Sequence, residues 1–468
     1  MSELLQRSVT ELRSDLDARK ISAEELMRAT LSRIEATQSR LNCFTSLRDE
    51  ELLISEARNA DARIARGDTR LLEGIPLGVK DLEDVEGEVT SYGSVPFKDN
   101  RALRDSIQVE RLRAAGAIVV GKTNTPEFGY TAISKNLLFG ASCNPWDLDR
   151  TPGGSSGGSS AGIAGGVISL ATASDGGGSV RIPASVTGCF GLKGSYGRIP
   201  TGPHDLWVMD DTSVHGPLTR SVADAALHLD AVAGPHPLDP NSLPSQGISY
   251  RESLEDMPSG LRAGFSPDLG YAVVQSDLAE VVEKAAGLMP ELGISLEGVE
   301  GGLPEPGGAW GFSGSWELLA RLHTYLPEHE EDFGRSFIEG VKAGARMTPE
   351  RWGQMRQLRS ITNAWLADVF ERYDILLTPT VPYDPPPARG PFLAELEGRR
   401  QPASNFGSFT MPFNLSWHPA ATVRAGLSAK GLPVGLQIVG PRHRDDLVLQ
   451  VARAFERHTG CFDTWPTV

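Results

Sequence analysis

Apolar and polar positions alternate between two periods along the chain, which predicts helices and strands in turn. Ser22-Ala-Glu-Glu25 has the form of a capping box, and the helix that it opens continues through Leu26 and Ile34. We predict further helices over 105–115 and 277–292 and from Asp445 onward, and strands over 117–120, 261–265, 374–378 (ended by Pro379) and 436–439. Alternating elements of this kind indicate an α/β fold, with a sheet covered by helices.

Stretches rich in proline and glycine interrupt this pattern. Residues 234–247, 300–311 and 382–391 are predicted to be long connections, which in compact domains are uncommon unless functional or disordered. The first two bracket a variable middle section, about residues 236–369, which we interpret as an inserted helical section that could form a lid. We expect one domain over 1–468, with a catalytic core at about 60–235 and 370–460.

The charge of the chain excludes several partners. Sixty acidic and 45 basic residues among 468 give a net charge of −15, whereas nucleic acids and anionic membranes reward dense positive charge. The first residues hold no apolar core of a secretory signal, and no apolar run reaches the ~20 residues that span a bilayer. The four cysteines lie far apart and the histidines show no metal-binding spacing. We expect a cytoplasmic protein that binds no nucleic acid, membrane, metal or cofactor.

Two clusters of glycine and serine, around Ser155 and Ser179, carry the candidate chemistry. Glycine permits a close approach of backbone to a ligand, so Gly176-Gly-Gly-Ser179 could aim several N–H groups at one oxyanion. Gly153-Gly-Ser-Ser-Gly157 also fits the G-x-S-x-G nucleophile elbow of α/β-hydrolases, with Ser155 as nucleophile. The phosphate-loop pattern is missing, which disfavours nucleotide binding. A flexible linker does not fit the small apolar residues over 161–173, which suit a buried helix and strand.

With these clusters the chain resembles the amidase signature family. The family pattern GGSSGG, then G-T-D-x-G-G-S-[IV]-R-x-P, is met by Gly153–Gly158 and Ser174–Pro183. Three more landmarks occur in order: GIPLGVKD at 74–81, GKTNTPEFG at 121–129 and GLPVGLQIVG at 431–440. The departures, ASD for GTD and GSYGR for KPTxGR, are mild, since Ser174 keeps the hydroxyl. The resemblance implies a large central mixed β-sheet with helices on both faces, and an enzyme that cleaves amide bonds.

By this resemblance three catalytic roles fall on Lys80, Ser155 and Ser179. Ser179 would attack the amide carbonyl, Ser155 would relay its proton across a non-prolyl cis peptide after Gly154, and Lys80 would be the base. A lysine acts as a base only when neutral, so its pKa, ordinarily ~10.4, must be lowered by burial among apolar and hydroxyl groups. The apolar run 75–79 before the lysine is consistent with such burial.

The resemblance also implies an oxyanion site made of backbone N–H groups. Its donors would be Gly176, Gly177, Gly178 and Ser179. We interpret Asp175 and Arg181, on either side of this loop, as an ion pair that shapes it.

The residues that bind substrate are predicted from the landmarks and from the aromatic residues. Gly129, Tyr130 and Thr131 occupy positions that line the acyl site in similar enzymes. An aromatic rim is expected from Trp207, Phe312, Trp316 and Trp417. Together they favour a neutral aryl or medium-chain acyl amide as the small-molecule substrate. Esters and carbamates (urethanes) are expected to be further substrates, cleaved through the same acyl-enzyme on Ser179.

Other functions stay open at this point. The A subunit of the glutamine-dependent aminoacyl-tRNA amidotransferase shares the catalytic residues, but it needs partner subunits and usually differs after Gly197. An α/β-hydrolase esterase would use Ser155, and a non-catalytic subunit would not retain all three catalytic positions. A homodimer is compatible with the sequence. Cys189 is interpreted as a core residue and His418 as a structural one.

Overall fold

The computed structural model describes residues 4–203 and 211–468, and these residues contain one central sheet of 11 strands. Its spatial order is β1-β3-β2-β6-β8-β7-β14-β15-β11-β9-β10. The strands are β1 Phe44–Leu47, β2 Pro76–Lys80, β3 Ile118–Thr123, β6 Leu170–Asp175, β7 Phe190–Lys193, β8 Val214–Thr219, β9 Arg262–Phe265, β10 Ser295–Gly298, β11 Ile375–Pro379, β14 Ala420–Leu427 and β15 Pro433–Val439. Neighbours pair in both directions, for example β2 with β6 in parallel and β14 with β15 antiparallel. The large mixed sheet expected from the resemblance is therefore confirmed.

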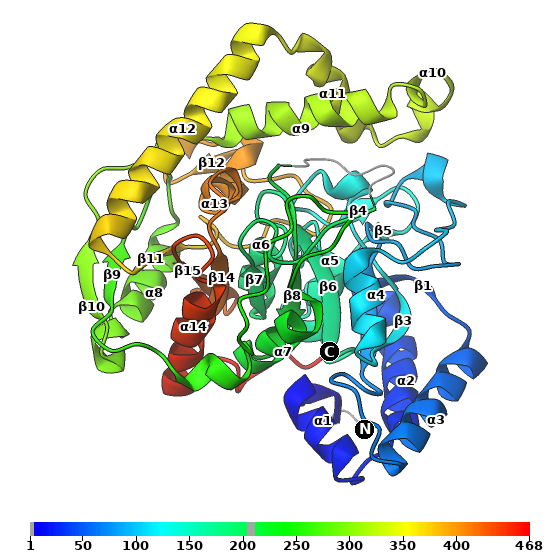
Figure 1. Cartoon of the computed structure of the whole chain (residues 1–468). Helices are drawn as coiled ribbons and strands as arrows, with labels where there is room; N and C mark the ends of the chain where they lie inside the picture. The colour runs from blue at the N-terminus through cyan, green and yellow to red at the C-terminus, as the bar shows by residue number, and fades with distance from the viewer. Residues whose placement is uncertain (1–3, 204–210) are drawn as a thin grey trace.

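Helices surround this sheet (Figure 1). They are α1 Val9–Asp17, α2 Ala23–Leu41, α3 Glu50–Ala65, α4 Ile107–Ala114, α5 Gly157–Ala164, α6 Arg181–Thr187, α7 Val222–Val232, α8 Ser276–Ala286, α9 Gly307–Leu322, α10 Leu326–His329, α11 Arg335–Ala343, α12 Pro349–Arg372, α13 Met411–Leu415 and α14 Asp445–Thr459. Two short hairpins pair β4 Lys135–Asn136 with β5 Gly140–Ala141, and β12 Glu395–Leu396 with β13 Arg399–Arg400.

The alternation of side chains along β15 shows that both faces of the sheet are covered. Val434, Leu436 and Ile438 join the main hydrophobic core, to which α14 contributes most of its apolar face. The residues between them point to the opposite face. There Gln437 accepts a hydrogen bond from the first residue of α6, and a Cβ at Gly435 would lie 2.5 Å from the Ser185 hydroxyl of the same helix. A strand buried on both faces explains the unbroken apolar character of this landmark.

Local patterns predicted most elements correctly. The capping box is present, since Glu25 N–H donates to Ser22 Oγ at 3.0 Å and Ser22 N–H donates to the Glu25 carboxylate at 2.8 Å. The helix predicted over 277–292 is too long: α8 ends at Ala286, and a separate 3₁₀ turn follows over Met289–Leu292. Glycine at 287 and proline at 290 account for this break. Strand β11 includes Pro379 as its last residue.

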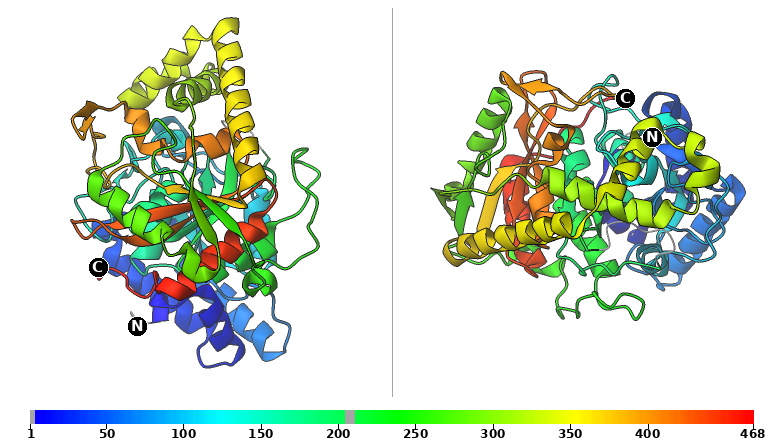
Figure 2. Two further views of the ribbon diagram at one scale, coloured as in Figure 1. Left: turned by 90° about the vertical axis from the view of Figure 1, so that its left-hand side faces the viewer. Right: turned by 90° about the horizontal axis from the view of Figure 1, so that it is seen from above.

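The middle section divides into two parts. Strands β9 and β10, with α8, extend the central sheet, so this part is not a lid. The helices α9–α12 gather at one end of the molecule, and α1–α3 lie toward the other end (Figures 1 and 2). Residues 300–311 are not all loop, because α9 begins at Gly307. A lid role stays a prediction for α9–α12 alone.

None of the helices among the described residues is both long enough and apolar enough to cross a membrane.

Candidate active site

The parallel pairing of β2 and β6 brings the lysine motif and the second Gly/Ser cluster to one edge of the sheet. Leu77 and Gly78 pair with Leu170 and Ala171, so both strands end at the same side. Lys80 is the last residue of β2, and Asp175 is the last residue of β6. Motifs that lie about a hundred residues apart in the sequence therefore meet at the carboxyl ends of neighbouring strands, where open α/β sheets bind their ligands.

Lys80 is fully buried, and among the described residues its Nζ contacts two hydroxyl groups and one carbonyl oxygen. Its Nζ lies 2.7 Å from Ser155 Oγ and 3.0 Å from Ser174 Oγ, and a longer contact of 3.4 Å joins it to the Ser174 carbonyl oxygen. The backbone N–H of Lys80 donates to Thr172 Oγ1 at 3.0 Å. The peptide bond between Gly154 and Ser155 is cis, as the resemblance implied.

Burial lowers the pKa of Lys80 to about 7, against the opposing effect of the Glu83 and Asp175 carboxylates. The cause is the loss of hydration, which disfavours the charged ammonium form. Among the described residues no carboxylate forms an ion pair with Nζ, so no ion pair stabilises the protonated form of Lys80. A neutral amine next to a hydroxyl can accept a proton from it.

Ser155 and Ser179 both line one large cavity of about 1360 Å³. The signature segments supply one wall of it, with Gly154, Ser155, Ser174, Gly176, Gly177 and Ser179. Ser179 is half-buried, whereas Ser155 is buried and lies between the cavity and Lys80. The order from the inside outward is thus amine, inner hydroxyl and cavity, with the hydroxyl of Ser179 at the cavity surface.

The predicted substrate-binding residues Gly129, Tyr130 and Thr131 also line this cavity. Gly129 has a φ of +68°, and a Cβ there would lie 3.1 Å from Ser155 Oγ and 2.8 Å from Leu82 Cδ1. Glycine is therefore required at this position for both its backbone conformation and its closeness to the inner serine.

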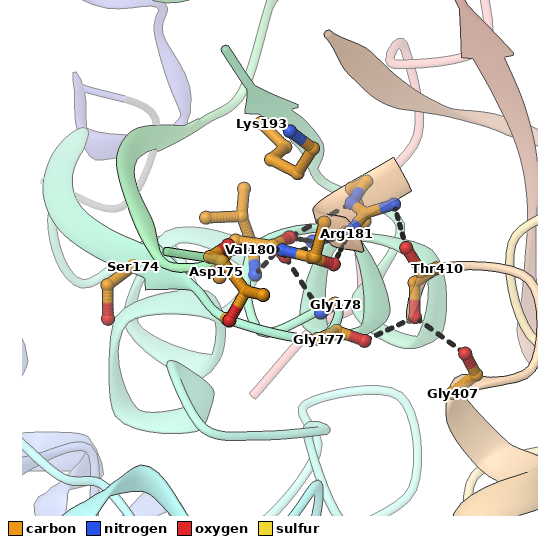
Figure 3. A network of polar contacts seen from close by, with 12 residues as sticks. Ser174, Asp175, Gly177, Gly178, Val180, Arg181, Lys193, Gly407 and Thr410 are labelled. Atoms are coloured by element: carbon orange, nitrogen blue, oxygen red, sulfur yellow. Dashed lines mark hydrogen bonds and ion pairs between the residues drawn. The ribbon is translucent and has the colours of Figure 1, made fainter. Parts of the chain in front are cut away.

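The glycine loop, Gly176–Ser179, is oriented by Asp175 (Figure 3). Gly178 N–H donates to Asp175 Oδ1 at 2.7 Å, and Val180 N–H donates to Oδ2 at 3.1 Å. This differs from the expectation for Gly178, because its N–H group already has an acceptor and Gly178 does not line the cavity. In the described part of the chain the N–H groups of Gly176, Gly177 and Ser179 have no such acceptor.

The Asp175–Arg181 ion pair expected from the sequence is confirmed, and it is fully buried. Arg181 binds both carboxylate oxygens, at 2.8 and 2.9 Å, and also donates to groups that come from much later in the chain. These acceptors are Thr410 O, Gln437 Oε1 and Asn414 Oδ1. Burial alone would raise the pKa of Asp175, but the charge and hydrogen bonds of Arg181 hold it well below its usual range. The glycine loop is therefore held by hydrogen bonds to a carboxylate that stays ionised.

Several residues of the site were not found by sequence reasoning. Thr410 Oγ1 donates to the Gly177 carbonyl oxygen at 2.6 Å, and Asn414 donates to both the Asp175 carbonyl and its carboxylate at 2.8 Å. Trp310, in the segment predicted to be a loop, donates from Nε1 to the Gly176 carbonyl oxygen at 2.9 Å. Nothing local distinguishes Trp310 from other tryptophans.

The predicted aromatic rim is wrong in its members. Phe312, Trp316 and Trp417 do not line the cavity: they pack beneath Arg351, beside Trp352 and on Tyr196. Trp207 lies outside the described residues. The aromatic residues that do line the cavity are Tyr92, Phe128, Tyr130, Trp310, Phe337, Phe392 and Phe406. Periodicity could not select them, because they come from separate loops and helices.

The two remaining interpretations from the sequence are confirmed. Cys189 is fully buried in the core, where burial raises the pKa of its thiol to about 11. His418 is buried against Phe370, and its Nδ1 lies 2.9 Å from Ser416 Oγ, away from the cavity lining. The described residues contain no group of three or more His, Cys, Asp or Glu side chains arranged to hold a metal ion.

The sequence matches the family described as Amidase over residues 25–449. The chain belongs to the amidase family. It is similar to an acylamidase of Rhodococcus erythropolis, with 36% identity over 469 residues that cover 96% of this chain and 94% of that protein. It is also 32% identical to the A subunit of the glutamyl-tRNA(Gln) amidotransferase of Geobacter sp. (strain M21), covering 98% of both chains.

Among solved structures, this amidase is similar to a bacterial aryl acylamidase of the amidase signature family. The two share 29% identity with a TM-score of 0.92, and the alignment covers 98% of each chain. The fold and the family expected from the sequence are thereby confirmed, and the protein is a hydrolase of amide bonds.

Proposed function

We propose that this amidase hydrolyses neutral aryl or medium-chain acyl amides through an acyl-enzyme on Ser179. The observation that carries the proposal is the contact of 2.7 Å between the buried Lys80 amine and Ser155 Oγ, at the base of a cavity that Ser179 also lines. The arrangement supplies a base, a relay and a nucleophile, and no histidine is among the described residues that line the cavity.

Acylation starts with neutral Lys80. Its Nζ takes the Ser155 proton while Ser155 Oγ takes the Ser179 proton, and Ser179 Oγ attacks the carbonyl carbon. The carbonyl π-electrons move to oxygen, and this oxyanion accepts hydrogen bonds from the free N–H groups of Gly176, Gly177 and Ser179. The tetrahedral intermediate then expels the amine, which takes a proton from Ser155 as Lys80 returns its own proton to Ser155. The products are the Ser179 ester and the free amine.

Deacylation repeats these transfers with water. A water molecule attacks the carbonyl carbon of the Ser179 ester. As it attacks, the water gives a proton to Ser155 Oγ, and Ser155 passes its own proton to Lys80. The second tetrahedral intermediate collapses, the C–O bond to Ser179 breaks, and Ser179 Oγ recovers a proton through Ser155. A carboxylic acid leaves and the enzyme returns to its starting state.

The lining of the cavity supports the choice of substrate class. Seven aromatic residues line it, and its volume exceeds the ~300–1000 Å³ of common small-ligand sites, which gives room for an aryl or a medium-length acyl group. Glu127 is the only carboxylate among the described residues of the lining, and it is occupied by hydrogen bonds from Ser94 Oγ and Gly334 N–H at 2.6 and 2.8 Å. This lining, as far as the structure describes it, therefore offers no free carboxylate to hold the α-amino group of glutamine.

A substrate panel tests this choice. We expect kcat/KM for aryl and medium-chain acyl amides to exceed that for glutamine by at least about 10²-fold, since the charged α-amino group of glutamine finds no free carboxylate in the described lining. Initial rates on aryl amides, aliphatic amides, anilides, esters, carbamates and glutamine measure it. Preference for glutamine would instead support the amidotransferase function, the second candidate. The homodimer and the cytoplasmic location stay predictions.

The pH dependence follows from the pKa of Lys80. Only neutral Lys80 accepts a proton, so we expect kcat/KM to fall about tenfold per pH unit below about 7 and to level off above it. The measurement is kcat/KM for a neutral aryl amide from about pH 5 to 9. Unfolding temperatures over the same range show whether the folded state persists. A flat profile contradicts the role of Lys80.

A matched variant assigns this titration to Lys80. Lys193 is also buried, and its pKa is lowered to about 7 as well, but the charge of Glu83 raises the pKa of Lys80 and not that of Lys193. Glu83→Gln removes that charge and can keep the contact that Glu83 makes with Gln108. The acid limb of the profile should then move to lower pH. An unmoved limb would assign the titration to another group.

A further inference from the structure

The two peptide units at the start of the glycine loop are held in different ways. Thr410 Oγ1 donates to the Gly177 carbonyl at 2.6 Å, and the Gly178 N–H of the same unit donates to Asp175 at 2.7 Å (Figure 3). This unit is fixed at both ends by groups outside the cavity. The preceding unit, between Gly176 and Gly177, is fixed at one end alone, where the Gly176 carbonyl accepts the hydrogen bond of Trp310 Nε1–H at 2.9 Å.

A planar trans peptide couples its two ends. The C=O and N–H groups of one unit point in opposite directions, so fixing the carbonyl of Gly176 also fixes the direction of Gly177 N–H. This N–H group has no acceptor among the described residues, and both glycines line the cavity beside Ser179. The hydrogen bond from Trp310 therefore sets the direction of an N–H donor that lies beside Ser179 in the cavity wall.

We propose that Trp310 is a positioning residue, which aims the Gly177 N–H group at the oxyanion. The proposal rests on the proposed function, since it needs an oxyanion formed at Ser179. The indole ring also packs on the loop, because a Cβ at Gly177 would lie 2.4 Å from Trp310 Cζ2. Glycine at 177 thus admits the ring, and the ring restricts the rotation of a peptide unit that glycine would otherwise leave free.

Trp310 also connects the glycine loop to the middle section of the chain. Trp310 belongs to α9, in the variable part of the chain, whereas the glycine loop belongs to the signature segment. Two other polar contacts hold this part to the cavity wall: Tyr130 OH lies 3.1 Å from Ser315 Oγ, and Gly334 N–H donates to Glu127 at 2.8 Å. Residues Gly311, Gly314 and Leu318 of α9 line the cavity too. A substrate that shifts α9 would thereby change the orientation of an oxyanion donor.

Trp310→Phe tests the proposal, because it removes the N–H donor and keeps an aromatic ring. Loss of one direct oxyanion donor lowers kcat about 10²–10³-fold, and Trp310 acts one step away, so we expect a fall in kcat of about 10–100-fold. KM should stay within about twofold, and the apparent pKa of the rate profile should not move. A trifluoromethyl ketone, whose adduct with Ser179 carries an oxyanion, should bind more weakly by the same factor as kcat falls.

Trp316→Phe is the matched control, since Trp316 lies on the same helix, packs on Trp352 and does not line the cavity. It should retain the kcat of the wild type. If Trp310→Phe does not fold, as judged by circular dichroism, then benzothienylalanine at 310 replaces it, because this residue has the indole shape without the N–H. Unchanged kcat and ketone affinity in a folded Trp310 variant would overturn the proposal.

The same experiment separates this proposal from the proposed function. Labelling of Ser179 by a fluorophosphonate in the wild type, together with unchanged kcat in the Trp310 variant, refutes the positioning role and leaves the function intact. A wild type that is labelled elsewhere, or that turns over amides without Ser179, refutes the proposed function itself and the positioning role with it.

Discussion

Ser179→Ala should abolish amide hydrolysis, with kcat lowered by about 10⁵–10⁶-fold, the loss seen when the nucleophile of a serine hydrolase is removed. The physical reason is that the variant lacks the hydroxyl on which the proposed acyl intermediate forms. Ser155 is buried, and its Oγ is held 2.7 Å from Lys80. The folded state should persist, because Ser179 is half-buried and the loop around it is anchored by Asp175, Thr410 and Trp310. Single-turnover hydrolysis of an aryl amide measures the loss.

Ser155→Ala is the matched comparison for this prediction. It removes the relay and keeps the nucleophile, so the expected loss is about 10²–10⁴-fold, the usual size of a general acid–base contribution. Under the alternative in which Gly153–Gly157 is a nucleophile elbow, the order of the two losses reverses. An active Ser179→Ala variant beside an inactive Ser155→Ala variant would therefore refute the proposed mechanism in favour of the esterase.

Lys80→Met should also remove activity, by about 10⁴-fold or more, since both proton transfers depend on the amine. Methionine is apolar and close in length, so it fills the buried position without a charge to solvate. Lys98→Met is the control, because Lys98 is exposed, lies outside the sequence motifs and does not line the cavity. Rates at about pH 9, where wild-type Lys80 is neutral, make the comparison independent of its protonation.

The same variant should change how the free energy of unfolding depends on pH. The folded pKa of Lys80 is about 7 and the unfolded value is about 10.4, so between these values the unfolded state binds more protons. The free energy of unfolding of the wild type should therefore rise as the pH increases from about 7 to about 10.4. Lys80→Met removes this contribution and leaves that of Lys193 in place. The free energy of unfolding is measured by urea unfolding of both proteins at several pH values. An equal dependence of this free energy on pH in the two proteins would contradict a buried neutral Lys80.

The meeting of Lys80, Ser155 and Ser179 at one site, which we propose as the catalytic trio, could be expected from the sequence because each residue lies in a continuous motif. The resemblance over several ordered landmarks singles out Lys80, Ser155 and Ser179, and the structure adds that Lys80 and Ser174 lie at the ends of parallel strands. Amphipathic periodicity and a capping box placed α2 in the same way. In these cases the determining interactions are local or strand-to-strand.

The support of the glycine loop could not be predicted, because its contacts cross large sequence separations. Trp310 reaches Gly176 across 134 residues, and Thr410 reaches Gly177 across 233. Nothing in the pattern around Trp310 marks it apart from Trp316, which lies on the same helix and does not line the cavity. The error at Gly178 has a different cause. A carboxylate three residues earlier takes its N–H group, and a sequence does not show which way a peptide unit turns.

The central claim is that the acyl group is carried by Ser179, and trapping the covalent intermediate tests it most directly. The wild type is treated with a fluorophosphonate at about pH 8–9, where Lys80 is neutral, and the labelled peptide is identified by mass spectrometry. We predict one adduct, on Ser179, and none in the Ser179→Ala variant. An adduct on Ser155, with Ser179 unmodified, would contradict the account.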